Sequence, residues 1–184
     1  VVPRPVVKAL TERALRETGA TEFSVLLCAY AVLLQRYSGQ DRVTVGTTVL
    51  NRTDADHLAT VGYFTNTVAL GVDLSDPQLT FRALLGQVGE STLDMMEHQD
   101  APYPKVLETL GVERAASHNP VFQTMLTVLG RRRGLDLGPG TVARPFPVTR
   151  TAAKFDLLLY AVEDEETFEF QLEYATDLFD ANTA

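Results

Sequence analysis

Hydrophobic residues recur at helical spacing in four stretches of the chain, namely 6–18, 21–38, 80–99 and 103–110. Apolar positions three or four residues apart are typical of helices with one buried face. Pro before the first stretch and Gly after the first two are the expected helix start and stop signals. In 21–38 the apolar residues lie on nearly all faces, which predicts a helix buried against several neighbours.

Five further segments have the composition or alternation of β-strands: 43–50, 65–74, 121–129, 155–162 and 168–174. Val and Thr dominate the first, and apolar residues alternate along the second. The last two flank the acidic turn 163–166 and predict a hairpin. This order of elements predicts a layered α/β (α+β) fold, with a mixed sheet and helices packed on one face.

A long connection at residues 130–150 separates the third predicted strand from the hairpin. It is rich in Gly and Pro and has no helical period. Connections of this length are uncommon inside a compact domain and are usually functional or disordered. We expect a crossover arm that leaves this part of the fold, and the alternative is an ordinary surface loop.

Composition narrows the class of protein further. With 184 residues, 45% of them hydrophobic and 22% charged, the chain resembles a folded domain or one lobe of a larger one. A formal net charge of −8 argues against binding a nucleic-acid backbone. No apolar run reaches the ~20 residues of a membrane span. We therefore expect a cytoplasmic protein that binds neither nucleic acid nor membrane.

Candidate catalytic and metal-binding residues are few. The single Cys28 lies in the most apolar predicted helix and is expected to be buried, and no Cys/His spacing predicts a metal site. His57, His98 and His118 are the three histidines, and none has the spacing of a catalytic triad. His98 ends a predicted helix and is expected to cap it. These residues predict a folded lobe without a catalytic set.

Three stretches resemble motifs of the condensation domains of nonribosomal peptide synthetases. Residues 61–67 (VGYFTNT) resemble (I/V)GxFxNT, and residues 98–103 (HQDAPY) resemble HQDxP(F/Y). Residues 114–122 (RAASHNPVF) resemble RDxSxNPLF, with Ala in place of the usual Asp. Shorter matches lie around them, at residues 39–41, 45–52, 154–157 and 174–180. The resemblance therefore extends over essentially the whole chain.

The resemblance implies a chloramphenicol-acetyltransferase-like fold with two lobes, of which residues 1–184 would be the C-terminal one. The family's HHxxxDG motif belongs to the N-terminal lobe, and this sequence has no paired histidines. The resemblance thus implies no catalytic residue in this chain and no activity of this lobe by itself. It also implies that the arm at 130–150 is a latch that crosses to the N-terminal lobe.

For the complete domain, the resemblance implies formation of an amide bond. An amine on an acceptor carrier protein attacks a thioester on a donor carrier protein, and both substrates are held on phosphopantetheine arms. The implied partners are the N-terminal lobe and the two carriers, with no cofactor bound directly. Much of the rate would then come from positioning the tethered substrates in a tunnel between the lobes.

The resemblance also assigns roles to individual residues. The substrate tunnel would be lined by Gly62, Tyr63, Phe64, Asn66 and Thr67. A structural role is implied for His98, Gln99, Asp100, Arg114, Asn119 and Pro120. Arg52 is a candidate for carrier docking. For Asn66 two roles stay open, because its amide suits holding a carbonyl or a backbone loop near the tunnel and equally suits locking a turn.

Two other functions remain as alternatives. One is a catalytically inactive condensation-like domain that recruits a tailoring enzyme, and the other is a carrier-binding module. The state of the HHxxxDG motif in the N-terminal lobe would separate them. An intact motif indicates an enzyme, a degraded motif indicates recruitment, and the lack of such a lobe indicates a binding module.

Overall fold

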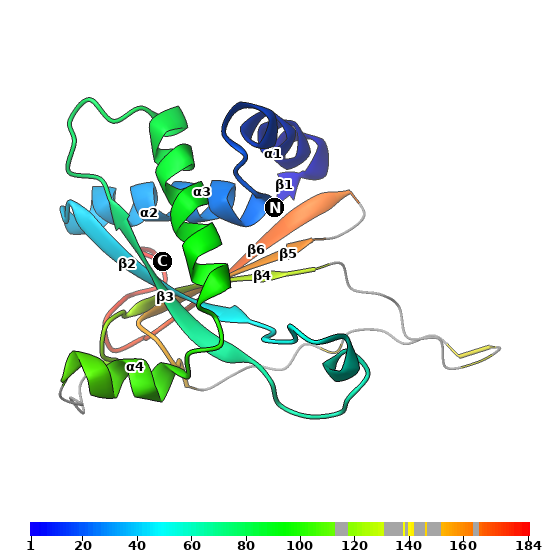
Figure 1. Cartoon of the computed structure of the whole chain (residues 1–184). Helices are drawn as coiled ribbons and strands as arrows, with labels where there is room; N and C mark the ends of the chain where they lie inside the picture. Colours follow the sequence, from blue (N-terminus) through cyan, green and yellow to red (C-terminus); the bar gives the residue numbers. More distant parts are fainter. Residues whose placement is uncertain (113–117, 131–137, 139, 142–145, 147–151, 164–165) are drawn as a thin grey trace.

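A computed structural model describes residues 1–112, 118–130, 138, 140–141, 146, 152–163 and 166–184. The elements follow the order β1 (Val2–Pro3), α1 (Arg4–Thr18), α2 (Glu22–Ser38), β2 (Arg42–Val49), η1 (Ala55–His57), β3 (Asn66–Asp73), α3 (Phe81–Glu97), α4 (Tyr103–Leu110), β4 (Thr124–Leu129), β5 (Leu157–Glu163) and β6 (Thr167–Tyr174) (Figure 1).

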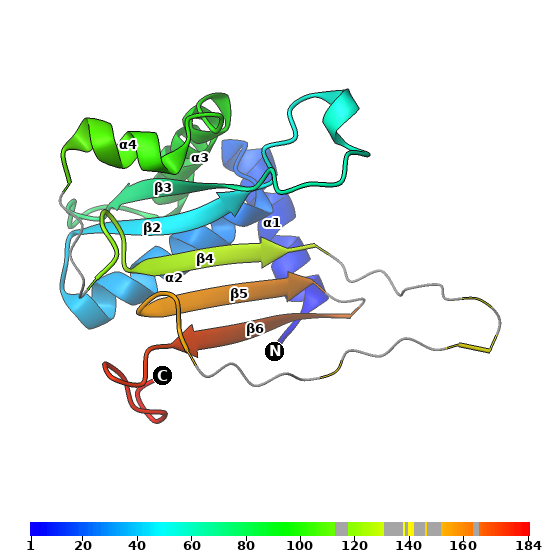
Figure 2. The same cartoon turned by 90° about the horizontal axis from the view of Figure 1, so that it is seen from below.

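The strands form one mixed sheet in the order β1-β6-β5-β4-β2-β3. The pairs β2–β4 and β4–β5 are parallel, and the pairs β1–β6, β5–β6 and β2–β3 are antiparallel. Figure 2 shows the five longer strands side by side, with α1, α2 and α3 behind them. The predicted mixed sheet, hairpin and helical layer are therefore confirmed.

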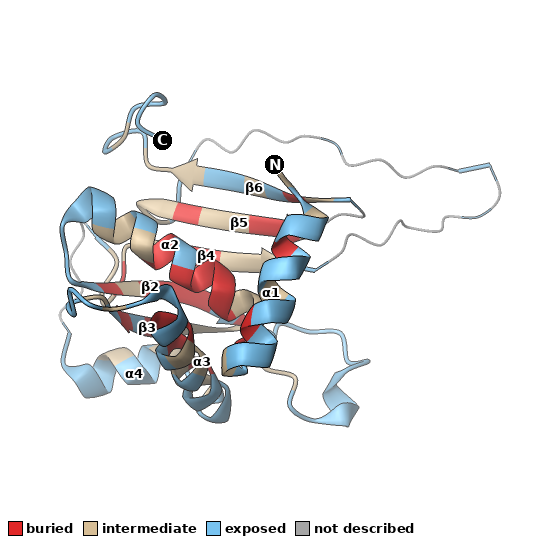
Figure 3. Ribbon diagram, turned by 90° about the horizontal axis from the view of Figure 1, so that it is seen from above, coloured by how far each residue is buried: buried red, intermediate tan, exposed pale blue. Residues whose placement is uncertain are grey.

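Helices α1, α2 and α3 cover one face of the sheet, and α2 is the most deeply buried of them (Figure 3). The core between helices and sheet holds Leu27, Cys28 and Ala31 of α2, with Val45, Leu126 and Ala161 from three strands. α4 lies instead beside the β3 edge (Figures 1 and 3). The second predicted helix is buried because the sheet and both neighbouring helices cover it.

The ends of the helices follow from local hydrogen-bonding groups. Thr21 caps α2 by accepting a hydrogen bond from the Ser24 N–H, and Thr80 caps α3 by accepting one from the Ala83 N–H. Gly39 ends α2 in the left-handed conformation, at φ 70°, which glycine adopts without strain. Sequence periodicity and capping therefore predict these ends to within a few residues.

The third predicted strand begins later than expected. Its apolar run starts at Val121, but β4 starts at Thr124. Val121 has a φ of 72°, which turns the chain out of the extended conformation and aims Phe122 at Gly46 of β2. The first three residues of the run therefore belong to a turn, and Phe122 of this turn packs against the sheet.

Two other features bear on the sequence predictions. Most of the predicted arm at 130–150 lies outside the described residues, as does Arg114. Within the described part of the chain, no single helix is long and apolar enough to span a membrane. The pair α1 and α2 passes that test together but meets at 102°.

Candidate functional site

Asn66, the first residue of β3, joins two of the matched motifs. Its Nδ2 donates hydrogen bonds to the backbone carbonyls of Gln99, at 2.8 Å, and Ala101, at 2.7 Å. Its Oδ1 accepts from the backbone N–H groups of Tyr103, at 3.3 Å, and Thr67, at 2.9 Å. Because the amide has two donor and two acceptor positions, these four bonds use its full capacity. Asn66 therefore holds the backbone of the turn between α3 and α4.

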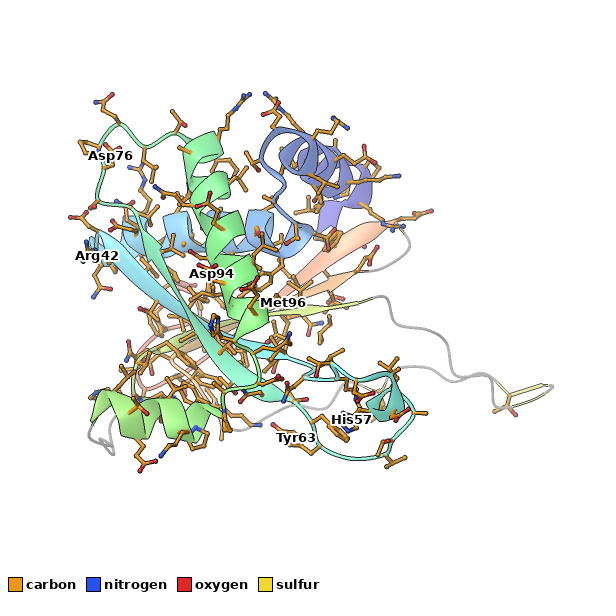
Figure 4. All side chains as sticks on the ribbon, viewed as in Figure 1. Arg42, His57, Tyr63, Asp76, Asp94 and Met96 are labelled. Atoms are coloured by element: carbon orange, nitrogen blue, oxygen red, sulfur yellow. The ribbon has the colours of Figure 1, made fainter. Side chains whose placement is uncertain are left out.

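The same turn is fixed from the end of α3. His98 is the C-cap of the helix, as expected, and its Nδ1 lies 2.8 Å from the carbonyl oxygen of Asp94. The Gln99 side chain donates to the carbonyl of Met96 at 2.8 Å. Asp94 and Met96 lie on the last turns of α3 (Figure 4). His98 and Gln99 thus hold backbone with their side chains, whereas Asp100 is exposed.

Tyr103 carries the connection to the third motif. Its hydroxyl donates to the carbonyl of Pro120 at 2.9 Å, and its ring lies 5.6 Å from the ring of Phe122. Phe122 is 2% exposed and packs on Gly46, where a Cβ atom would overlap its ring. Successive strand residues alternate between faces, and Val45 belongs to the helix-covered core. Gly46 and Phe122 therefore meet on the opposite face of the sheet.

The third motif in turn reaches the start of β5. Asn119 donates through Nδ2 to the carbonyl of Lys154 at 3.0 Å, and Phe155 stacks on Phe122 at 5.7 Å. Contacts therefore run without interruption from residue 66 through 99–103 and 119–122 to 154–155. These contacts bring together segments that are far apart in the sequence. Of the residues with a predicted structural role, His98, Gln99, Asn119 and Pro120 make hydrogen bonds here.

Arg52 lies in the connection between β2 and β3, and its guanidinium is engaged within that loop. It donates to the carbonyls of His57, Thr60 and Gly62, the last two at 2.9 and 3.3 Å. Its Cζ lies 4.2 Å from the centroid of the Phe64 ring, a cation–π contact. The carrier-docking role of Arg52 stays a prediction, and in this structure its guanidinium makes three hydrogen bonds within its own loop.

The remaining residues of the first motif differ in exposure. Tyr63 is 89% exposed and belongs to the same loop as His57 (Figure 4), whereas Phe64 is half-buried. Gly62 passes close to the Phe64 ring, since a Cβ there would lie 3.1 Å from it. Thr67 pairs with Thr48 across the β2–β3 ladder. Their predicted role in lining a substrate tunnel remains untested.

The described residues offer little acid–base or nucleophilic chemistry. Burial raises the pKa of the Cys28 thiol to about 12, so it is neutral and unreactive near neutral pH. Burial also raises the pKa of the Tyr103 phenol. Within the described part of the chain, no three His, Cys, Asp or Glu side chains group as metal ligands.

Sequence reasoning missed several contacts of this site. Phe122 stacks on Phe155 and packs on Gly46 at the sheet face opposite the helices, and neither strand alternation nor motif matching predicts these contacts. The bond from the Tyr103 hydroxyl to Pro120 was also missed. A Tyr hydroxyl that is partly buried usually has a hydrogen-bond partner, which was the available signal.

Known proteins are similar to this chain in sequence and in fold. The family model described as Condensation domain matches residues 4–184. Tyrocidine synthase 3 of Brevibacillus parabrevis is 43% identical over 171 residues, covering 91% of this chain but 3% of the synthase. The condensation domain from monacolin K polyketide synthase MokA has a TM-score of 0.80 at 25% identity, covering 100% of this chain and 42% of that one.

A further solved structure, the X-domain from teicoplanin biosynthesis, has a TM-score of 0.77 at 29% identity. The match covers 94% of this chain and 40% of the X-domain chain. Likeness to solved condensation domains confirms the predicted chloramphenicol-acetyltransferase-like fold. With the matched motifs in contact and the family model spanning residues 4–184, this chain belongs to the condensation domain family.

Proposed function

We propose that residues 1–184 form the C-terminal lobe of a nonribosomal peptide synthetase condensation domain. The complete domain joins donor and acceptor substrates, each tethered to a carrier protein, through an amide bond in the cytoplasm. Condensation domains form amide bonds, which supports the reaction class. The chain matches 42% of one solved condensation domain and 40% of an X-domain, which supports the assignment to one lobe.

The contact between motifs carries this proposal. Asn66 of the first motif holds the backbone of residues 99–103 in the second. Tyr103 then holds Pro120 of the third. Three segments that match condensation motifs thus form one connected structure at an end of β3, as expected for parts of one wall of a shared site.

The residues of this wall have separate tasks in the proposal. Asn66 and Phe64 support the wall and do not contact substrate. The Asn66 amide bonds to backbone groups, and the Phe64 ring contacts Arg52 of the same loop. Tyr63 is 89% exposed and faces the tunnel, where it contacts substrate or the phosphopantetheine arm. The catalytic histidine comes from the N-terminal lobe, so the chain by itself forms no amide bond. No cofactor is bound directly in this proposal.

The arm at 130–150 is proposed to cross to the N-terminal lobe as a latch. β4 and β5 are parallel neighbours, with Thr124 opposite Leu157 and Leu129 opposite Val162. The chain must therefore return from the end of β4 to the start of β5 at the opposite end of the sheet. This requirement supports a long connection, and the family resemblance supports its direction. Amide hydrogen exchange in the complete domain tests the proposal: protection at 141–148 supports a latch, and fast exchange contradicts it.

The reaction is tested with the complete parent domain and both carriers. The donor carrier is loaded with an aminoacyl thioester and the acceptor carrier with a second amino acid. Intact-protein mass spectrometry should show the donor acyl group moving onto the acceptor carrier. An acceptor loaded with an N-acetylated amino acid is the matched control, because it lacks the nucleophilic amine. Failure to transfer any acyl group would contradict the proposed reaction.

A second function, recruitment of a tailoring enzyme, is favoured by one observation. The chain is 29% identical to the X-domain from teicoplanin biosynthesis, and that X-domain has been solved in complex with OxyB. A parent domain that transfers no acyl group but binds an oxygenase encoded beside it would support recruitment. Acyl transfer without such binding would support condensation.

A further inference from the structure

The connection between β2 and β3 is a closed loop with its own small interior. Val49 pairs with Asn66, so the two ends of residues 50–65 are neighbours in the sheet. Most side chains of this loop are exposed, and those of Arg52 and Phe64 are half-buried. Compact surface loops with adjacent ends are held by their own side chains and are frequently functional. Contacts that hold this loop in place therefore also position its last residues, 61–65, which lead into β3.

Arg52 occupies the interior of this loop. Its guanidinium donates to three carbonyls, of His57, Thr60 and Gly62, spread over six residues of the chain. It also contacts the Phe64 ring, whose centroid lies 5.2 Å from that of His57. Three backbone carbonyls and one aromatic ring of the loop thus contact the same guanidinium, which fills the space that hydrophobic side chains fill in other loops.

The chemistry of these contacts requires arginine. A planar guanidinium presents several donors in a fixed fork and can stack on an aromatic face at the same time. A lysine ammonium is a compact point charge that cannot span separated carbonyls in this way. The neighbouring Gly62 fits the same arrangement, because its backbone passes close to the Phe64 ring.

From these contacts we infer that Arg52 is a positioning residue. It sets the course of residues 57–64 and thereby the placement of Tyr63 and the rest of the motif at residues 61–67 along the tunnel wall. This inference deepens the proposed function and rests on it for its effect on turnover. Because the main core lies between the helices and the sheet, removal of Arg52 loosens the loop and leaves the fold intact.

The test combines hydrogen exchange with kinetics in the complete condensation domain. The amides of His57, Leu58 and Thr60 donate hydrogen bonds within the loop, so their exchange reports its order. Arg52→Ala and Arg52→Lys should both speed this exchange and lower kcat about 10- to 100-fold, because small misplacements near a reacting centre have effects of that size. The KM for the acceptor and donor carriers should stay near the wild-type value.

Arg42→Ala is the matched control. It removes an exposed cation from β2, where Arg42 pairs with Asp73, and leaves the loop contacts in place. This variant should change neither loop exchange nor kcat. Phe64→Leu, which removes the aromatic face under the Arg52 guanidinium, should share part of the defect of Arg52→Ala.

The outcomes separate the possible roles. Unchanged exchange at residues 57–60 in Arg52→Ala overturns the inference, as does a loosened loop with unchanged kcat. A raised KM for a carrier with normal exchange would instead establish docking and also overturn it. If the wild-type domain transfers no acyl group, the proposed function fails, while the exchange data still decide whether Arg52 organises the loop.

Discussion

Replacing Asn66 by alanine should loosen the turn between α3 and α4. The substitution removes hydrogen bonds to two carbonyls, at Gln99 and Ala101, and from two N–H groups, at Tyr103 and Thr67. A hydrogen bond contributes ~1 kcal/mol on average, but solvent near the exposed Ala101 can replace part of the loss. We therefore expect a destabilisation of about 2 kcal/mol.

The assay compares melting temperature with turnover in the complete domain. A loss of about 2 kcal/mol corresponds to a decrease in Tm of about 4–8 °C for a domain of roughly 150–250 residues, and of less in a larger one. Since the Asn66 amide is fully used by backbone groups, turnover per folded molecule should change little. An unchanged Tm together with a large loss of turnover would contradict the backbone role of Asn66 and show that its amide acts on the substrate.

Asn66→Asp sharpens this test because it keeps the size of the side chain. The new carboxylate retains an acceptor for Tyr103 but turns its second oxygen toward the carbonyls of Gln99 and Ala101. Repulsion raises the pKa of that carboxyl in the folded state above its unfolded value. The extra destabilisation relative to Asn66→Ala is therefore present above the raised pKa and lessens as the pH falls through it. Urea unfolding at pH 7 and at pH 4.5 measures the difference.

Three further predictions concern stability and use thermal unfolding. Gly46→Ala should destabilise by about 1–3 kcal/mol, because the new Cβ overlaps the Phe122 ring, whereas Gly71→Ala on β3 should not, because nothing lies within 4 Å of its Cβ. Tyr103→Phe should lose about 1 kcal/mol with its hydroxyl bond, and no change in Tm would contradict that bond. Burial, and then the carboxylate of Glu163, raise the pKa of the Glu22 carboxyl in the folded state. The contribution of Glu22 to the free energy of unfolding is therefore favourable at low pH and is lost as the pH rises through the raised pKa. Glu22→Gln should therefore raise Tm at pH 7 but not at pH 4.

The helical layer of the fold could be predicted because its signals are local. Thr21 and Gly39 bound α2 through bonds to residues three or four positions away, which the sequence displays directly. The start of β4 could not be predicted in this way. Val121 and Phe122 continue an apolar run, and their turn out of the strand depends on Gly46, which is distant in the sequence.

The candidate site shows the same division. The motif matches identified the segments that form the site, but the residue type of Asn66 was compatible with two roles. Three of its four partners are backbone groups 33 to 37 residues further along, and backbone groups leave no trace in a side-chain pattern. Arg52 was equally ambiguous, because an arginine that organises a loop and one that docks a carrier have the same sequence signature.

The role of this lobe is tested most directly by measuring amide-bond formation with and without the rest of the domain. Donor and acceptor carriers, both loaded, are incubated with the complete parent domain or with residues 1–184, and the acceptor-bound product is measured by intact-protein mass spectrometry. We predict product with the complete domain and none above background with residues 1–184. A dipeptidyl thioester formed by residues 1–184 without the N-terminal lobe would contradict this prediction.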